Sequence, residues 1–397
     1  MNPLPNASRN MAEKLATLPS IKVTRRSAVG TLAAMTAGFY TRARAVENPI
    51  NIAQTIALSG PLAELGQAMH EGAKACFAAV NAKGGVNGQA IELNTSDDGY
   101  DVPRSLANAK GFIANPGTFA LFNCMGTPMI EAMLPLVIES GIPFFAPFTG
   151  ALSARPEKAR SVFNIRASYA EEAEQLVQHL STVGIKRIAI AYQNNTFGKE
   201  VFNATQRSMA KYKLEAAAIV TVENNSSDAA AAAAKVANSQ PDAVLVGLAG
   251  KPTIEFVKAI RLQRKGLPLY ALSIMGAAAT LKAMGGDATG IAMSQVVPLP
   301  TNGVVPVVRE FLQAWKATGT TLQPSHLALE GYINARVFTE ALRRAGRNPT
   351  RSNFIESTWN IKRYDLGGFE VSFTEPTKNA SKFVELTMVS SDGRFIR

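Results

Sequence analysis

The hydrophobic positions of this chain alternate between two periods along most of its length. A nearly continuous apolar run at 51–58 is typical of a buried strand. The apolar residues that follow are spaced three and four apart, which is typical of one face of a helix: Leu62, Leu65, Met69, Ala73, Cys76 and Val80. Pro61 suits the first turn of such a helix, and Gly84-Gly85 suits its end. The pattern therefore predicts a strand and then a helix.

The same strand-then-helix order continues to residue 272. We expect further strands at 90–95, 119–123, 143–146, 187–192, 217–222, 243–248 and 269–272, and helices at 103–113, 129–139, 169–183, 199–212, 228–237 and 253–264. Two long helices are expected at 304–318 and 326–345, and an antiparallel strand pair at 369–373 and 382–389. Alternating strands and helices predict parallel sheets covered on both faces. A chain of 397 residues is too long for a single hydrophobic core of ordinary size, so its length favours two domains.

The N-terminal segment has the order of an export signal. Thr24-Arg25-Arg26-Ser27 precedes an apolar stretch at 28–40, and Ala43-Arg44-Ala45 ends it. The arginine pair resembles a twin-arginine signal, although Ala28 stands where that pattern usually has Phe. The apolar stretch is shorter than the ~20 residues that span a bilayer. We therefore expect residues 1–45 to be a cleaved signal peptide and the mature protein to work in the periplasm.

The formal net charge of +11 raises the question of nucleic-acid binding. Residues 1–45 hold seven basic residues and one acidic residue, which leaves 34 basic and 29 acidic residues, a net charge of +5. The remaining basic residues are scattered along the chain. A nucleic-acid-binding domain usually gathers them on one face or along one helix. We therefore expect no nucleic-acid partner.

Motifs that would indicate an enzyme are missing. The first strand ends in Leu58-Ser59-Gly60-Pro61-Leu62, without the GxGxxG spacing of a dinucleotide site, and a Rossmann-type enzyme stays the less favoured alternative. Pro252 follows Gly250-Lys251 where a phosphate-binding loop needs Ser or Thr. No GxSxG or HExxH motif is present. We expect no catalytic residue, no cofactor and no metal.

Two pairs of residues have a structural and a chemical interpretation. Asp97-Asp98 ends a strand just before Gly99, where acidic side chains stabilise turns more often than they bind metals. Cys76 falls on an apolar helix face and Cys124 at a strand end. A disulfide is possible in an oxidising compartment, but we favour two buried free thiols.

Several short motifs together indicate a family. Ser59-Gly60-Pro61 opens the first helix, Asn81-Ala82-Lys83-Gly84-Gly85 ends it, and Asp97-Asp98 follows the next strand. Glu139-Ser140-Gly141-Ile142-Pro143 and Phe197-Gly198 come later. From about Pro49 to the C-terminus the chain resembles the leucine/isoleucine/valine-binding protein family, the type I periplasmic binding proteins of ABC importers.

The resemblance implies a fold and a function. The fold would be α/β, with two Rossmann-like lobes and three hinge crossings near residues 166–168, 294–300 and 348–361. Lobe 1 would comprise 46–166 and 296–350, and lobe 2 would comprise 167–295 and 351–397. The chain would be a monomeric receptor that closes on a small-molecule ligand bearing a carboxylate and delivers it to an ABC permease in the inner membrane. A receptor of the same fold that signals to a regulator is the alternative.

Parallel sheets bind ligands at the carboxyl ends of their strands, where helix N-termini attract anions. The resemblance implies that two such loops hold the ligand carboxylate, Gly126-Thr127 and Phe148-Thr149-Gly150. Helix capping is an equally weighted interpretation of each threonine. The expected ligand-binding residues are Ser59, Leu65, Gly126, Thr127, Phe148, Thr149, Gly150, Phe197, Ala249, Ile274 and Met275.

One departure from the family pattern concerns the ligand itself. Amino-acid binders of this family usually carry an acid in the loop that here reads Ser273-Ile274-Met275-Gly276-Ala277-Ala278, without a carboxylate. A buried ammonium group without a charged partner costs several kcal/mol. Either another acid serves, or the ligand is an aromatic or aliphatic acid without an ammonium group.

Overall fold

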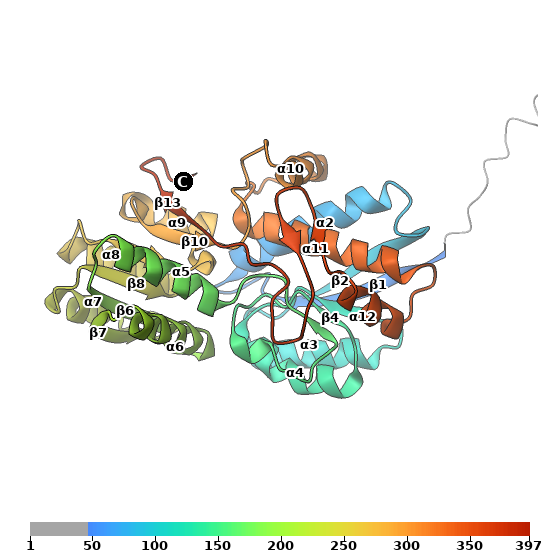
Figure 1. Cartoon of the computed structure of the whole chain (residues 1–397), viewed down its shortest axis with the longest axis horizontal. Helices are drawn as coiled ribbons and strands as arrows, with labels where there is room; N and C mark the ends of the chain where they lie inside the picture. The colour runs from blue at the N-terminus through green and yellow to red at the C-terminus, as the bar shows by residue number, and fades with distance from the viewer. Residues whose placement is uncertain (1–46) are drawn as a thin grey trace, which may run out of the picture. The chain divides into compact units, whose positions relative to one another are not determined.

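The computed structural model describes residues 47–397, and the expected export signal at 1–45 lies outside the described residues. Two large β-sheets, each with helices around it, make up most of this range (Figure 1). We call the first sheet with its helices lobe 1 and the second sheet with its helices lobe 2. The expected α/β class with two parallel-rich lobes is confirmed.

The sheet of lobe 1 has five strands in the order β2-β1-β3-β4-β5, and all neighbours are parallel. Successive residues of β1 face opposite sides: Ile52 packs with α2 and α11, and Ala53 packs with α3 and α4. The strands are β1 (Glu47–Ile56), β2 (Gln89–Asp97), β3 (Ala120–Phe122), β4 (Phe144–Phe145) and β5 (Val162–Phe163). The helices are α2 (Ala63–Asn81), α3 (Val102–Ala114), α4 (Thr127–Ser140), α10 (Pro306–Thr318), α11 (His326–Ala345) and α12 (Arg351–Trp359).

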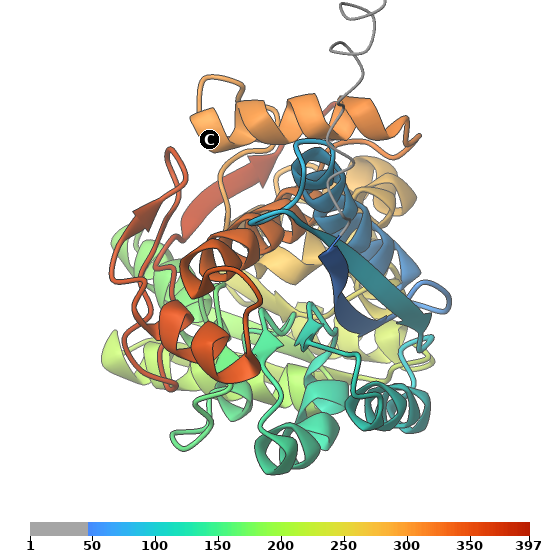
Figure 2. The same cartoon turned by 90° about the vertical axis from the view of Figure 1, so that its right-hand side faces the viewer.

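Two glycines allow α2 and α11 to touch through their backbones (Figure 2). A Cβ on Gly72 of α2 would lie 1.8 Å from the carbonyl oxygen of Ala328, and a Cβ on Gly331 of α11 would lie 2.1 Å from that of Met69. Real Cβ atoms do not approach other atoms so closely. This close crossing fixes α11, and with it Glu330, against α2.

The sheet of lobe 2 has seven strands in the order β14-β13-β10-β9-β8-β6-β7. Its strands β6 to β10 are parallel, and β13 and β14 add antiparallel pairs beyond β10. The strands are β6 (Arg187–Gln193), β7 (Glu215–Val222), β8 (Ala243–Gly247), β9 (Leu269–Ala271), β10 (Ala292–Gln295), β13 (Glu385–Val389) and β14 (Phe395–Ile396). The helices are α5 (Tyr169–Thr182), α6 (Thr196–Lys211), α7 (Ala229–Asn238), α8 (Lys251–Gln263) and α9 (Ala278–Met284).

The C-terminal part of the chain differs from the expected pairing. The strands expected at 369–373 and 382–389 do not pair with each other; β12 (Glu370–Val371) pairs with β11 (Tyr364–Asp365), and β13 joins lobe 2. Residues 351–397 were expected in lobe 2, whereas Phe354, Trp359 and Phe373 pack in the core of lobe 1. Their aromatic rings fill the space beside Phe163 at the end of the first sheet.

Two of the segments that connect the lobes are hydrogen-bonded to each other. The N–H groups of Ala380 and Ser381 donate to the carbonyl oxygens of Asn164 and Ile165 at 2.8 and 2.9 Å. The first segment leads from β5 to α5, and the second leads from Ala380 to β13. Since each is held by the other, the two segments form one connection rather than two independent chains.

Candidate functional site

The two expected ligand loops lie side by side because they extend a pair of parallel strands. Beyond β3 and β4, the Phe148 N–H donates to the carbonyl oxygen of Cys124 at 2.8 Å, and the Gly126 N–H donates to that of Phe148 at 3.3 Å. Gly126 has φ 98°, and a Cβ there would lie 2.9 Å from the ring of Tyr100. Only glycine combines this backbone with this close approach.

The hydroxyls of Thr127 and Thr149 meet at the end of these loops. Their oxygens are 2.7 Å apart, and both side chains are buried. Thr149 Oγ1 also accepts a hydrogen bond from the Ala151 N–H at 3.1 Å. Thr127 begins α4, whose start is not capped by any side chain, so its first N–H groups add a partial positive charge beside the hydroxyls.

A cavity lined by both lobes opens next to Thr127. Its lining residues carry no formal charge: Leu62, Leu65, Tyr100, Met125, Gly126, Thr127, Phe148, Tyr169, Phe197, Ala249 and Ile274. The rings of Tyr169 and Phe197 meet edge to face, with centroids 5.4 Å apart. In this arrangement of the lobes its volume is about 20 Å³, the space of one water molecule. The arrangement is therefore a small, mainly apolar chamber with a polar end.

This chamber adjoins a larger hollow of about 280 Å³, which shares Leu62, Tyr100 and Ala249 with it. The far wall of the hollow carries the amides of Gln193, Asn195 and Asn224, which are linked to one another: Gln193 Nε2 and Asn195 Nδ2 donate to Asn224 Oδ1 at 2.7 and 3.0 Å. Gln193 Oε1 accepts from the Ala249 N–H at 3.1 Å. The polar wall belongs to lobe 2.

Most of the expected site residues line the chamber, and four do not. Leu65, Gly126, Thr127, Phe148, Phe197, Ala249 and Ile274 line it. Thr149 does not line the chamber but contacts Thr127, which does. Gly150 allows the close approach of Tyr169, because the ring of Tyr169 lies 2.4 Å from where a Cβ on Gly150 would be. Met275 lies in the core of lobe 2. Ser59 is turned away, because its hydroxyl donates to Asp97 Oδ2 at 2.5 Å.

The acidic pair Asp97-Asp98 builds the turn that presents Tyr100. Asp97 Oδ1 accepts from the N–H groups of Leu58, Ser59 and Gly99 at 2.8 to 3.0 Å. The Ser59 hydroxyl and these amides lower the pKa of Asp97. Buried Asp98 accepts from the Tyr100 N–H at 2.9 Å and from the Thr55 hydroxyl at 3.0 Å. Burial raises the pKa of Asp98. These bonds hold Tyr100 at φ 61°, with its ring in the chamber.

A buried arginine lies behind the aromatic wall. The Arg166 guanidinium stands over the rings of Phe148 and Tyr169, 5.2 and 5.8 Å from their centroids. Its Nη2 donates to Glu172 Oε1 at 3.3 Å and to the Ser273 hydroxyl at 2.5 Å, and its Nε lies 3.7 Å from Glu330 Oε1. Burial alone would lower the pKa of Arg166, but Glu330 and Glu172 outweigh it and raise that pKa. Arg166 therefore links lobe 2 to α11 of lobe 1.

Two contacts outside the chamber also join the lobes. The carboxylate of Glu64, on α2 of lobe 1, accepts from the N–H of Thr280 at 3.2 Å and from the N–H of Ala279, at the start of α9 in lobe 2. Glu200 Oε2 of α6 accepts from the Leu152 N–H of lobe 1 at 3.2 Å. These contacts join α2 to α9 and α6 to the segment that follows β4.

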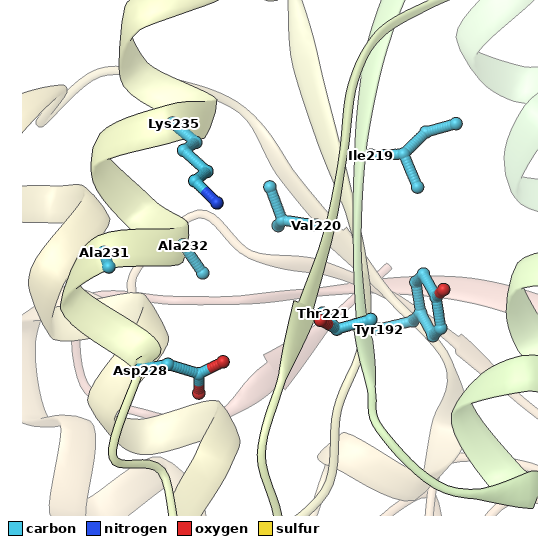
Figure 3. Close-up of a pocket in the computed structure, with 8 residues that line it drawn as sticks. All are labelled: Tyr192, Ile219, Val220, Thr221, Asp228, Ala231, Ala232 and Lys235. Carbon is cyan, nitrogen blue, oxygen red and sulfur yellow. The ribbon is translucent and has the colours of Figure 1, made fainter.

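A depression elsewhere in lobe 2 is lined by that lobe alone. It measures about 220 Å³ and lies between α7 and strands β6 and β7 (Figure 3). Lys235 points from α7 toward β7, and Asp228 accepts from the Glu223 N–H at 2.8 Å. Because all its lining residues belong to lobe 2, movement of lobe 1 would not enclose a ligand there.

Within residues 47–397, no helix has the length and hydrophobicity that crossing a membrane requires. Over the same range, no three His, Cys, Asp or Glu side chains gather as they would around a metal ion. Cys76 and Cys124 are both buried and are not joined. Burial raises the pKa of each thiol to about 12.

Sequence reasoning missed the two tyrosines of the chamber. Tyr100 follows the Asp97-Asp98 turn, and Tyr169 follows the first expected crossing at the start of α5. The sequence shows an aromatic residue directly after each of these features, and this position could have indicated that both tyrosines line the site. Leu62 and Met125 were also missed, although Leu62 directly follows Ser59-Gly60-Pro61 and Met125 directly precedes Gly126-Thr127.

Comparison with known proteins agrees with this arrangement. The model of the family described as periplasmic binding protein matches residues 49–394. A substrate-binding periplasmic protein from Ralstonia solanacearum is 31% identical, covers 87% of this chain and 99% of its own, and superposes with a TM-score of 0.82. A solute-binding protein of an ABC transporter from R. palustris, solved in complex with benzoate, is 19% identical, with a TM-score of 0.78 over 88% of this chain and 95% of its own.

Curated relatives match over a shorter range. The Leu/Ile/Val-binding protein of Escherichia coli (strain K12) is 23% identical over 168 residues, which is 42% of this chain. This chain spans about half the length of such curated relatives, 46% in the case of the Escherichia coli protein. The family match, by contrast, includes every residue of the chamber. The chain belongs to the periplasmic binding protein family, of the leucine/isoleucine/valine-binding type.

Proposed function

We propose that this protein is a periplasmic receptor for an ABC importer and that it closes its two lobes on a small organic carboxylate. The observation that carries the proposal is the meeting of the Thr127 and Thr149 hydroxyls at the uncapped start of α4, facing a chamber lined by both lobes. Hydroxyl and backbone N–H donors at a helix start suit an anionic oxygen. The R. palustris relative with benzoate indicates that the fold accommodates an aromatic acid.

The remainder of the chamber suits an apolar body rather than an amino group. Phe148, Tyr169 and Phe197 supply aromatic faces and edges, and no lining residue is acidic. Acids on the surrounding elements are already engaged: Glu64 by the amides of α9, and Glu172 and Glu330 by Arg166. A ligand ammonium would have to displace one of these pairings, which is costly in a buried site.

Closure by hinge movement follows from where the donors and the cover lie. The carboxylate donors belong to lobe 1, and Phe197, Ala249 and Ile274 belong to lobe 2. A ligand held on lobe 1 gains its contacts with lobe 2 only when the lobes meet, so binding shifts the population toward the closed form. The permease would then recognise the closed form. No lining group is placed as a nucleophile with an adjacent base, and we propose no reaction.

The test compares ligands that share one carbon skeleton. Leucine, 4-methyl-2-oxopentanoate, 4-methylpentanoate and 4-methylpentanamide differ only in the groups on carbons 1 and 2, and benzoate adds an aromatic body. Calorimetric titration should give binding of the acids without an ammonium group and none of the amide. Tighter binding of leucine than of 4-methylpentanoate would contradict the missing-ammonium argument, and binding of the amide would contradict the carboxylate site.

Transport itself needs a separate measurement. A deletion strain should lose uptake of the ligand identified by titration, and the gene for this chain should restore it. Unchanged uptake in the deletion strain, together with intact binding in solution, would favour a sensing receptor over an importer.

A further inference from the structure

A second cavity, of about 830 Å³, lies on a different part of the molecule from the carboxylate chamber. Its walls come from α9 and the β13–β14 hairpin of lobe 2, from residues 299–301, and from residues 323–326 at the start of α11 in lobe 1. It shares no lining residue with the chamber. Its volume is in the range of small-molecule sites, about 300 to 1,000 Å³.

His326 is the polar group that marks this cavity as a site. Its side chain is 5% exposed, yet neither ring nitrogen has a hydrogen-bond partner. The imidazole meets the ring of Phe395 edge to face, with centroids 4.9 Å apart. Burial lowers the pKa of His326 to about 3, so the ring is neutral and offers one N–H donor and one acceptor. A buried polar group without a partner is costly, and a bound ligand would supply one.

The backbone beside His326 favours an anion. Ser325 caps α11 by accepting from the Ala328 N–H at 3.2 Å, while the first N–H groups of the helix lie outside its internal hydrogen bonds. The 20-residue helix places the positive end of its dipole at this point. Lys282 of α9 is exposed on the lobe 2 wall, and within residues 47–397 it forms no ion pair. Arg394, the other cation, is paired with Asp392.

Most of the remaining surface of the cavity is apolar, although Thr301, Gln323, Ser391 and Asp392 also line it. Leu281, Leu299, Pro324 and Ile396 are among its lining residues, and Ile396 is a large hydrophobic side chain that is 43% exposed. Hydrophobic walls with a few converging polar groups are the usual composition of a small-molecule site.

We propose that this cavity binds an amphiphilic organic anion, with the anionic group at the start of α11 beside His326 and the apolar body between α9 and the β13–β14 hairpin. Because the walls belong to both lobes, the occupant binds one arrangement of the lobes better than another. Binding of this anion therefore changes the affinity of the chamber for the carboxylate ligand. By linkage, binding of the carboxylate ligand changes the affinity of the second cavity for the anion by the same factor.

The experiment uses histidine NMR and sodium octanoate as the probe. The chain has three histidines, so protein labelled with ¹⁵N-histidine and carrying no histidine tag gives a simple ring spectrum. The His326 signals are identified by their loss in His326→Phe. Octanoate should shift the His326 signals in a saturable manner and leave those of His179 in place. Octanol, which lacks the charge, and acetate, which lacks the apolar chain, should shift them little.

Two matched variants decide where the probe binds. Lys282→Glu should weaken octanoate binding by roughly tenfold, since it replaces a positive charge that attracts the anion by a negative charge that repels it. Lys235→Glu, the same charge reversal on α7, should leave it unchanged. Thr149→Val should also leave the His326 shift in place, because the two cavities are separate. Melting curves of each variant exclude loss of the fold.

Three results would overturn the proposal. They are no saturable shift of His326, an equal shift with octanol, and a shift that disappears in Thr149→Val, which would mean that octanoate acts through the carboxylate chamber. The first two results do not bear on whether the chamber binds its own ligand, and the third would support binding of a carboxylate in the chamber.

Discussion

The hydroxyl oxygens of Thr127 and Thr149 are 2.7 Å apart, although the two residues follow different strands of lobe 1. Between them they have two hydroxyl hydrogens, and at most one can be donated within the pair. The other is available to a ligand, as are the first N–H groups of α4. This pair is consequently the most direct place to test the carboxylate site.

Thr149→Val should weaken binding of the carboxylate ligand by about 1 kcal/mol or more, because it removes one hydroxyl and leaves the Ala151 N–H without its acceptor. Thr149→Ser keeps the hydroxyl and should bind nearly as tightly as the original protein. Calorimetry with the tightest acid from the ligand series provides the measurement. Equal affinities for the valine and serine variants would remove Thr149 from the site.

Glu64→Gln should lower ligand affinity without touching the ligand. The charged acceptor for the amides of Ala279 and Thr280 would become neutral, and hydrogen bonds to charged groups are worth about 1.5 to 3 kcal/mol. Small-angle X-ray scattering of the ligand-free variant should show a larger radius of gyration. Glu71→Gln is the matched control, since Glu71 lies on the same helix but pairs with Lys74 within lobe 1. If both variants behave alike, Glu64 does not hold the lobes together.

Glu330→Gln should change how stability depends on pH. Burial raises the pKa of Glu330 to about 7, against the opposing effect of Arg166. A carboxyl whose pKa is higher in the folded state than in the unfolded state stabilises the fold fully below its unfolded pKa, here about 4.5. This contribution to the free energy of unfolding disappears as the pH rises to the folded pKa of about 7. Between pH 4.5 and 7 the melting temperature of the original protein should therefore fall relative to that of the variant. Above pH 7 the difference between the two melting temperatures should stay constant. A constant difference across this window would contradict the raised pKa.

Gly72→Ala should be strongly destabilising, because the new Cβ would stand 1.8 Å from the carbonyl oxygen of Ala328. Overpacking of this kind costs about 1 to 3 kcal/mol. Gly111→Ala is the control within another helix of lobe 1: nothing lies within 4 Å of its Cβ position, and alanine favours the helix by up to about 1 kcal/mol. Denaturant unfolding should give opposite signs for the two variants. A neutral Gly72→Ala would mean that α2 and α11 are free to move apart.

Much of the fold was predictable from periodicity alone. The apolar pattern repeats over several turns in long helices such as α2 and α11, and over several residue pairs in long strands such as β1 and β6. The pattern therefore identifies each of them as helix or strand. β10 was missed because it is only Ala292–Gln295, and it buries the polar side chains of Ser294 and Gln295. Those side chains have partners, Glu172 and Thr387, that are far away in sequence and that no local pattern reveals.

The candidate site was predictable where it depends on lobe 1 and less so where it depends on contact between lobes. Thr127 and Phe148 follow strands, and the carboxyl ends of parallel strands meet at one edge. The interlobe role of Arg166 could not be read from the sequence, because its partners Glu172, Ser273 and Glu330 come together only in the folded chain. Ser59 was expected in the site from a motif, yet the motif serves the turn around Asp97.

The strands β13 and β14 are the last elements of the chain, and they lie beyond β10 in the sheet of lobe 2. During synthesis, the edge of β10 therefore stays open until residues 385–396 have left the ribosome. Open edges of this kind recruit strands from other molecules. A chain that ends before Glu385 would leave the same edge unprotected, so truncated forms of this protein should aggregate rather than accumulate as folded lobes.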